Sequence, residues 1–153
     1  MSEVQIVAFS VNGRTFGIEA MSIKRLIKCQ DLQEVEDMPE YMAGYITVEN
    51  EKIPVVDVGV KFDSKPIERS KNSKIIISGE NGLLTGFLVD DVTELIKVDS
   101  SDIEETPEIV RLAGNTCVKK VAKKDGKLII IVEINAVLSK EEKEKIHQKE
   151  EIH

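Results

Sequence analysis

Few residues of this 153-residue chain have types and spacings that could carry out chemistry. The two histidines, His147 and His153, both lie in the charged C-terminal stretch, where we expect them to be solvated tail residues. They therefore predict neither a catalytic triad nor a zinc site. The sequence has no glycine-rich phosphate-binding loop and no Gly-x-Ser-x-Gly nucleophile motif. Cys29 and Cys117 form no Cys-x-x-Cys pair, so we expect two reduced thiols in a cytoplasmic protein.

Two acidic segments are candidates for a cation-binding site or an acid–base pair. Residues 99–105 lack the glycine at position 6 and the glutamate at position 12 of a calcium-binding loop, so we expect a solvated loop there. Asp90 and Asp91 are neighbours, and neighbouring side chains on a strand point to opposite faces. We therefore expect Asp90 to be a turn residue or a buried hydrogen-bond acceptor. The sequence favours a binding protein over an enzyme and predicts no metal or cofactor.

The charge and composition exclude several classes of partner. The net charge is −7, and no run of Lys or Arg could follow a phosphate backbone, so neither nucleic acid nor an anionic membrane surface is expected to bind. The apolar run 4–11 is too short to span a bilayer, and we expect no direct membrane insertion. Aromatic residues make up only 4 %, so the core must consist of Val, Ile and Leu, which favour strands.

Four pairs of apolar runs joined by turn residues predict four β-hairpins. Asn-Gly and Asp-Gly are typical of tight hairpin turns because both central residues need positive φ. The predicted turns are Asn12-Gly13, Glu49-Asn50-Glu51, Asn81-Gly82 and Asp125-Gly126. Four hairpins in a chain of this length predict an all-β protein.

Helical signals are few. Residues 19–28 place apolar side chains at helical spacing, enough for two or three turns, and 91–96 could form a short helical turn. Ser139 and Glu142 have the spacing of a capping box, which predicts a charged helix running into the tail at 139–153.

An internal repeat organises the chain. Asn12-Gly13 and Asn81-Gly82 lie 69 residues apart, and at the same offset Gly17 matches Gly86, Leu26 matches Leu95 and Ile27 matches Ile96. Residues 55–58 (VVDV) match residues 131–134 (IVEI) at an offset of 76. We therefore predict two similar barrels on a shared core, formed by residues 1–66 and 67–138. The sequence leaves open whether strand 4–11 is exchanged into the second unit.

Three segments carry a family resemblance that extends from Gln5 to Leu138. They read FGIEAMSIKRLIK, MPEYMAGYITVENEKIPVVDVGVKF and IIISGENGLLTGFLVDDVTELI, and their most specific parts are 39–46, 53–58 and 86–90. In order and spacing they resemble the CheW family of chemotaxis coupling proteins. The closing segment KLIIIVEINAVL is similar to the last barrel strand of that family and its exit into a helix.

The resemblance implies two five-stranded, Src-homology-3-like β-barrels that share a hydrophobic core, with a short helix after the first hairpin and a C-terminal helix. It implies a non-enzymatic adaptor without cofactors. Its partners would be the regulatory domain of the histidine kinase CheA and the cytoplasmic tips of methyl-accepting chemoreceptors. Such a protein is cytoplasmic, is recruited to membrane-associated receptor arrays, and supports their assembly and the control of the kinase.

Two alternatives stay open. The regulatory domain of the kinase shares the double-barrel fold, so a fragment of a kinase would look similar, although we expect a complete small protein. A small-molecule- or metal-binding β-barrel is the alternative from another class.

The resemblance also implies receptor-binding positions. Ile23 corresponds to one on the short helix, and Val92 and Leu95 correspond to two in the second barrel; each could equally be a core residue. Lys74 falls where the family tends to have an apolar contact.

Arg25 and Glu49 depart from the family pattern, which has glutamate and arginine at these positions. Since both charges are reversed together, we expect a structural Arg25–Glu49 ion pair with its ends exchanged, and receptor binding that uses a re-matched charge. Asn50 replaces the usual turn glycine, a mild change because Asn tolerates positive φ.

Overall fold

The computed structural model describes residues 2–34, 36–80, 82–105 and 117–151, and strands dominate them. One sheet has the order β8-β1-β2-β11-β10-β9 and the other β3-β6-β7-β5-β4. The first comprises β1 (Glu3–Val11), β2 (Arg14–Glu19), β8 (Asp91–Asp99), β9 (Ile103–Glu105), β10 (Val118–Lys124) and β11 (Lys127–Val132). The second comprises β3 (Arg25–Lys28), β4 (Met42–Val48), β5 (Glu51–Asp57), β6 (Lys74–Glu80) and β7 (Leu83–Val89). The helices are η1 (Ala20–Ser22), α1 (Val58–Asp63), η2 (Ser100–Asp102), η3 (Ile134–Ala136) and α3 (Lys140–Glu151).

All four predicted hairpins are confirmed as antiparallel pairs: β1–β2, β4–β5, β6–β7 and β10–β11. Their turn residues have the positive φ that the turn chemistry requires, for example 49° at Asn12 and 67° at Asn50. Asn81 lies outside the described residues, but Gly82 beside it has φ of 79°. The all-β class is therefore confirmed.

The repeat corresponds to equivalent places in the two sheets. Gly17 of β2 pairs in parallel with Ile131 of β11, and its match Gly86 of β7 pairs in parallel with Val55 of β5. A Cβ added at either glycine would lie 2.6 or 2.8 Å from an isoleucine methyl of the adjacent antiparallel strand. Both sheets therefore need glycine where three strands approach most closely.

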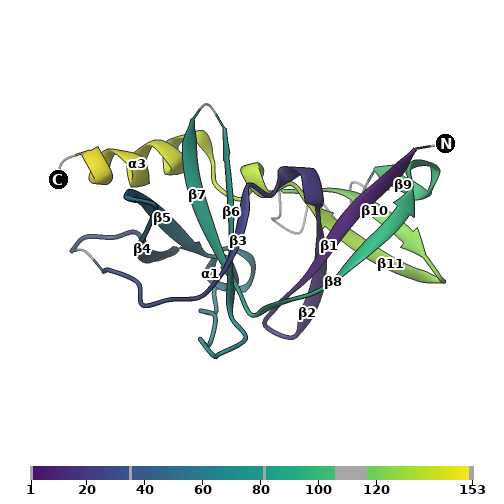
Figure 1. Ribbon diagram of the computed structural model, residues 1–153, viewed down its shortest axis with the longest axis horizontal. Helices are drawn as coiled ribbons and strands as arrows, with labels where there is room; N and C mark the ends of the chain where they lie inside the picture. The colour runs from purple at the N-terminus through teal and green to yellow at the C-terminus, as the bar shows by residue number, and fades with distance from the viewer. Residues whose placement is uncertain (1, 35, 81, 106–116, 152–153) are drawn as a thin grey trace.

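Residues 1–66 and residues 67–138 each contribute strands to both sheets. The hairpin β1–β2 lies in the sheet of β8, β10 and β11, and the hairpin β6–β7 lies in the sheet of β3, β4 and β5 (Figure 1). After β2 the chain turns through η1 and crosses to pair β3 with β6. Strand β1 and its hairpin partner β2 therefore lie in one sheet with β8, β9, β10 and β11.

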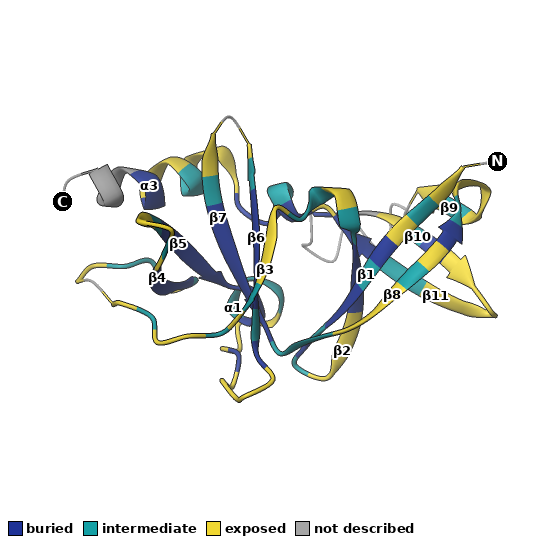
Figure 2. Ribbon diagram, in the orientation of Figure 1, coloured by how far each residue is buried: buried dark blue, intermediate teal, exposed yellow. Residues whose placement is uncertain are grey.

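One hydrophobic cluster extends through both sheets, as Figure 2 shows by the buried segments of β1, β2, β5, β6 and β7. It combines Phe9, Phe16 and Ile18 from the six-stranded sheet with Val55 and Phe87 from the other. A smaller cluster at the far end of the six-stranded sheet comprises Ile6, Val98, Ala122 and Ile131. The shared core is therefore confirmed.

The helical predictions for 19–28 and 91–96 were largely wrong. The first segment forms a single 3-10 turn, η1, and then the strand β3; the second is part of β8. Periodicity in short apolar runs does not separate helix from strand, and here partner strands determine the outcome: β6 pairs with β3, and β1 pairs with β8.

The predicted capping box is present at the start of α3. The Ser139 hydroxyl accepts a hydrogen bond from the Glu142 backbone N–H at 3.1 Å, and the Glu142 carboxylate accepts one from the Ser139 N–H at 2.9 Å. Glu142 also forms a 2.8 Å ion pair with Lys61 of α1. These contacts fix the start of the helix against the five-stranded sheet.

His147 is buried, so the expectation of a solvated tail residue was wrong; His153 lies outside the described residues. The inner face of α3 carries His147 beside Ile146, whose carbonyl accepts a hydrogen bond from the Tyr45 hydroxyl at 3.1 Å. The two His147 ring nitrogens lie 2.7 and 3.1 Å from backbone carbonyl oxygens of α3 and β7. Even a highly charged helix buries one face when it packs on a sheet.

Asp57 joins β5, α1 and the segment that follows. Its buried carboxylate accepts hydrogen bonds from the backbone N–H of Val60, at 3.2 Å, and of Ile67, at 3.1 Å. Burial raises the pKa of Asp57, and the backbone hydrogen bonds oppose that rise only in part.

We predict that the stability advantage of the native protein over Asp57→Asn falls as the pH rises. A carboxyl whose folded pKa is raised contributes its stability below the unfolded value, about 4, and loses it as the pH rises through the folded pKa. Urea unfolding of both proteins between pH 4 and 7 measures this. Asp57→Ala should lower the free energy of unfolding by about 1–3 kcal/mol, because buried N–H groups lose their hydrogen-bond acceptor. A wild-type advantage that grew with pH would contradict the assignment.

Candidate functional site

Arg25 and Glu49 come together although they lie on opposite edges of the five-stranded sheet. Arg25 begins the edge strand β3, and Glu49 is in the turn that follows the other edge strand, β4. The curled sheet brings the Arg25 Nη1 to 3.1 Å from the Glu49 Oε1. The two side chains are 46 % and 77 % exposed, so the ion pair is open to solvent and to a partner.

A groove of about 470 Å³ lies beside this pair. Its walls are formed by the pair itself and by Lys24, Val48, Glu51, Ile53, Ile77 and Leu84. Its lining combines four charged and four apolar side chains, which suits an amphipathic segment of a partner protein. Leu26, the next residue of β3, is 42 % exposed but does not line this groove.

The three apolar residues of the predicted receptor site differ in exposure. Ile23 follows η1 and Val92 is near the start of β8; both are half-buried and pack against the main core cluster. Leu95, further along β8, is 55 % exposed. Of the three, Leu95 therefore offers the most surface to a partner, while Ile23 and Val92 also serve packing.

Lys74 begins β6 and lies beside the end of β3 that is opposite to Arg25. It is paired with Lys28, and its Nζ lies 3.2 Å from the Asp91 carboxylate, next to Val92. The structure thus places charged contacts at both ends of β3, with Arg25 at one end and Lys74 at the other. Val92 is the residue after Asp91, the partner of Lys74. Leu95 lies on β8, an edge strand of the other sheet.

Asp90 is a hydrogen-bond acceptor at the crossover from β7 to β8, as predicted. Its carboxylate accepts a hydrogen bond from the backbone N–H of Asn12, and its own N–H donates to the Ser10 carbonyl at 2.9 Å. It therefore ties the crossover to the first hairpin, which is a structural role.

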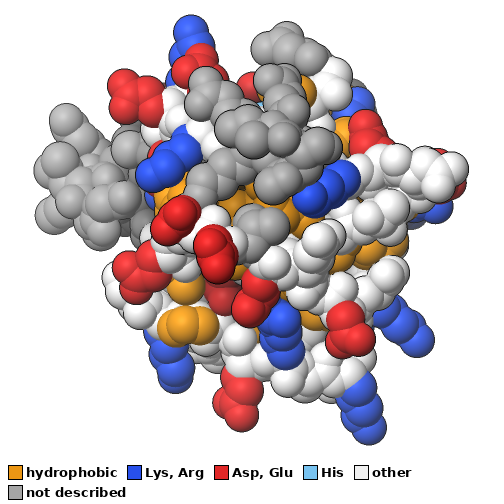
Figure 3. Space-filling view, turned by 90° about the vertical axis from the view of Figure 1, so that its left-hand side faces the viewer, with side chains coloured by type: hydrophobic (Ala, Val, Ile, Leu, Met, Phe, Trp, Pro, Cys, Tyr) orange, Lys and Arg blue, Asp and Glu red, His pale blue; other side chains and the backbone are white. Residues whose placement is uncertain are grey.

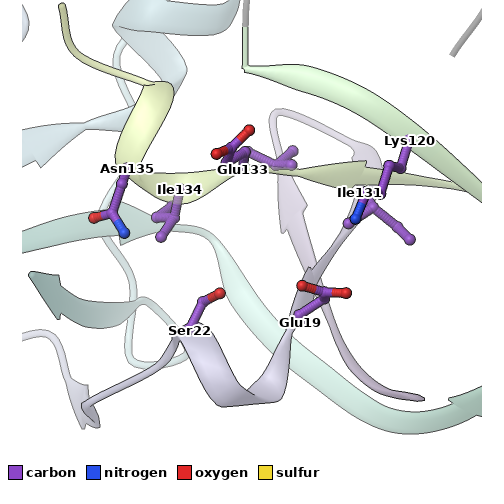
Figure 4. A pocket seen from close by; sticks show the side chains of 8 residues that line it. Glu19, Ser22, Lys120, Ile131, Glu133, Ile134 and Asn135 are labelled. Carbon is purple, nitrogen blue, oxygen red and sulfur yellow. The ribbon is translucent and has the colours of Figure 1, made fainter. Parts of the chain in front are cut away.

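A pocket that sequence reasoning missed is lined by strands β2, β10 and β11 of the six-stranded sheet and by the short helices η1 and η3 (Figure 4). It has a volume of about 220 Å³, and Glu19, Ser22, Lys120, Glu133 and Asn135 contribute its polar lining. These residues come from three separate stretches of the chain, 19–22, 120 and 133–135, so no spacing in the sequence could reveal them. Within the described residues no cluster of three or more His, Cys, Asp or Glu side chains could hold a metal ion.

The surface mixes charges of both signs. Figure 3 shows acidic and basic side chains interspersed with small hydrophobic areas on one end of the molecule. Among the described helices, none is long and apolar enough to cross a membrane.

The two cysteines differ in environment. Cys117 is buried in the main cluster, and burial raises the pKa of its thiol to about 11. Cys29 is half-buried; burial raises its pKa, and the nearby Arg69 charge partly counters the rise. Thiolate is the reactive form, so accessibility and pKa both disfavour reaction at Cys117.

We predict one thiol that reacts in the folded protein and two after unfolding. Dithionitrobenzoate titration at pH 8, with and without denaturant, measures the count. Cys29→Ser should abolish the native reaction and Cys117→Ser should leave it. Rapid reaction of two thiols in the folded state would contradict the burial of Cys117.

We predict a small coupling energy between Arg25 and Glu49, about 0.2–1 kcal/mol, because the pair is exposed. A double-mutant cycle with Arg25→Ala and Glu49→Ala, followed by urea unfolding, measures it. The exposed pair Lys123–Glu104, at 3.2 Å, provides a matched cycle on the other sheet. A coupling of zero would remove the structural role of the Arg25–Glu49 pair.

Comparisons with known proteins agree with the fold. Residues 5–142 match the CheW-like domain family. The chain is 28 % identical to a chemotaxis protein CheW of Bacillus subtilis, over 90 % of this chain and 88 % of that protein. It is 26 % identical to a chemotaxis protein CheW of Rhizobium meliloti, over 92 % of this chain and 90 % of that protein.

The crystal structure of the scaffolding protein TtCheW from Thermoanaerobacter tengcongensis matches with a TM-score of 0.80 and 29 % identity, over 91 % of this chain and 90 % of that one. Because the family match spans well over half of its residues, this chain belongs to the CheW-like family of chemotaxis scaffolding proteins.

Proposed function

We propose that this chain is a non-enzymatic adaptor that couples the cytoplasmic tips of methyl-accepting chemoreceptors to the regulatory domain of the histidine kinase CheA. The observation that carries the proposal is membership of the CheW-like family over residues 5–142, with the same fold as a scaffolding protein. In this role the protein is cytoplasmic, is recruited to membrane-associated receptor arrays, and supports their assembly and the control of the kinase.

The two-sheet architecture supports a role in holding two partners at once. The strands β3 and β8 are edges of different sheets, and edges offer backbone groups and side-chain rows to a partner. The exposed Leu26 and Leu95 are matched residues of the repeat, one on each of these strands. An adaptor needs such separate surfaces, and an enzyme does not.

Receptor binding would use the groove beside Arg25 and Glu49, together with Ile23, Val92 and Leu95. The ion pair is exposed, so a partner can approach either charge without disrupting the core. Charges on an interface rim mainly set specificity and the rate of association. The reversed pair therefore implies a receptor segment whose own charges are re-matched to it.

Calorimetric titration of the folded protein with the regulatory domain of a kinase, and then with a receptor-tip fragment, tests the proposal. We expect saturable binding to both. Arg25→Glu and Glu49→Arg should each weaken binding of the receptor fragment by about 5–50-fold, because like charges then face each other. Lys123→Glu, in an exposed pair on the other sheet, serves as the control and should leave receptor binding unchanged.

Binding to neither partner would overturn the adaptor role while leaving the fold intact. If the protein binds the kinase domain but neither charge reversal changes its affinity for the receptor fragment, the receptor does not bind at β3.

A further inference from the structure

The two halves of the molecule fill equivalent places differently. In the first half Phe9, Phe16 and Phe62 form an aromatic cluster, with ring centroids 5.9 Å apart for Phe9 and Phe16 and 5.0 Å apart for Phe16 and Phe62. Phe16 lies on β2 and Phe62 on α1, and the rings pack between this helix and the first hairpin. Aromatic pairs at these separations favour tight packing.

The repeat offsets identify the counterparts of these phenylalanines in the second half. The 69-residue offset relates Phe9 to Ser78 and Phe16 to Thr85, and the 76-residue offset relates Phe62 to Leu138. Ser78 donates a hydrogen bond to the Ser22 carbonyl at 2.6 Å. All three counterparts are smaller than phenylalanine, so the second half lacks the aromatic volume that fills the first.

A groove occupies this place in the second half. It has a volume of about 370 Å³ and lies between the β6–β7 hairpin and α3. Thr85 and Leu138, two of the counterparts, line it together with Phe87 and the half-exposed Leu83. Lys140, Lys143, Glu80 and Glu144 also border it, and a 3.3 Å ion pair joins Lys143 to Glu80.

We propose that this groove docks an aromatic side chain, of the size of phenylalanine, presented by a segment of a partner protein. The first half shows that a phenyl ring fits between a hairpin and the helix that follows the equivalent strand. Phe87 and Leu138 contribute apolar lining, and the Lys and Glu side chains that also line the groove suit a protein segment. The groove shares no lining residue with the one beside Arg25 and Glu49.

The binding should be weak for an isolated side chain and specific for the ring. We expect N-acetyl-phenylalanine amide to bind with a Kd on the order of a millimolar, since few atoms are buried. A two-dimensional NMR titration follows the amide signals of β7 and α3 in the full chain. N-acetyl-alanine amide is the control probe and should produce no saturable shifts.

Variants locate the site. In Thr85→Phe the new phenyl ring should occupy the groove, so that the probe no longer binds and the shifts disappear. Leu83→Ala should weaken binding several-fold. Leu128→Ala removes a leucine that is 66 % exposed on β11 and should change nothing. If Thr85→Phe does not fold, Leu83→Ala decides the question. No shifts, equal shifts with both probes, or shifts that survive Leu83→Ala unchanged would overturn the proposal.

Discussion

The exchange of hairpins between the repeats is the constraint on which the rest of the structure depends. Each sheet combines a hairpin from one repeat with strands from the other. The parts are joined by β1–β8 and β2–β11 in one sheet and by β3–β6 and β5–β7 in the other. Neither repeat could complete its own sheet. Folding therefore joins residues far apart in sequence, and the core cluster that results belongs to both sheets. At Gly17 and Gly86 a Cβ would lie only 2.6 or 2.8 Å from an isoleucine of the hairpin partner strand, so the packing leaves room for glycine alone.

A polar network around Asn12 ties the two sheets together outside the core. The Asn12 side chain donates hydrogen bonds to the Asp63 carboxylate, at 3.3 Å, and to the Lys65 carbonyl, at 2.9 Å, and its backbone N–H donates to Asp90. Arg14 forms an ion pair with the same Asp63. The turn of the first hairpin is thereby fixed to the end of α1, the helix that follows β5 of the other sheet. For an adaptor this matters, because partners held on different sheets keep a defined geometry only if the sheets do not move relative to each other.

Local chemistry and the repeat predicted much of this fold, and tertiary pairing decided the rest. The turns at Asn12-Gly13 and Asp125-Gly126 were predictable because few residues accept positive φ. The capping box was predictable because its two hydrogen bonds lie within four residues. The strands β3 and β8 were read as helical because short apolar runs carry no distinct period, and only their partners β6 and β1 make them strands. The burial of His147 and the pocket shown in Figure 4 depend on segments brought together by folding, for which the sequence carries no local signal.

For the candidate site, the sequence predicted the ion pair between Arg25 and Glu49 but not the groove beside it. Reversal of both charges indicated that the two side chains meet, and they do so across the two edges of one curled sheet. An exposed pair of this kind contributes little to stability. Stability alone therefore gives little reason for two opposite charges at these positions. The pair lines a groove together with the apolar side chains of Val48, Ile53, Ile77 and Leu84, and this supports the proposal that a partner recognises the two charges.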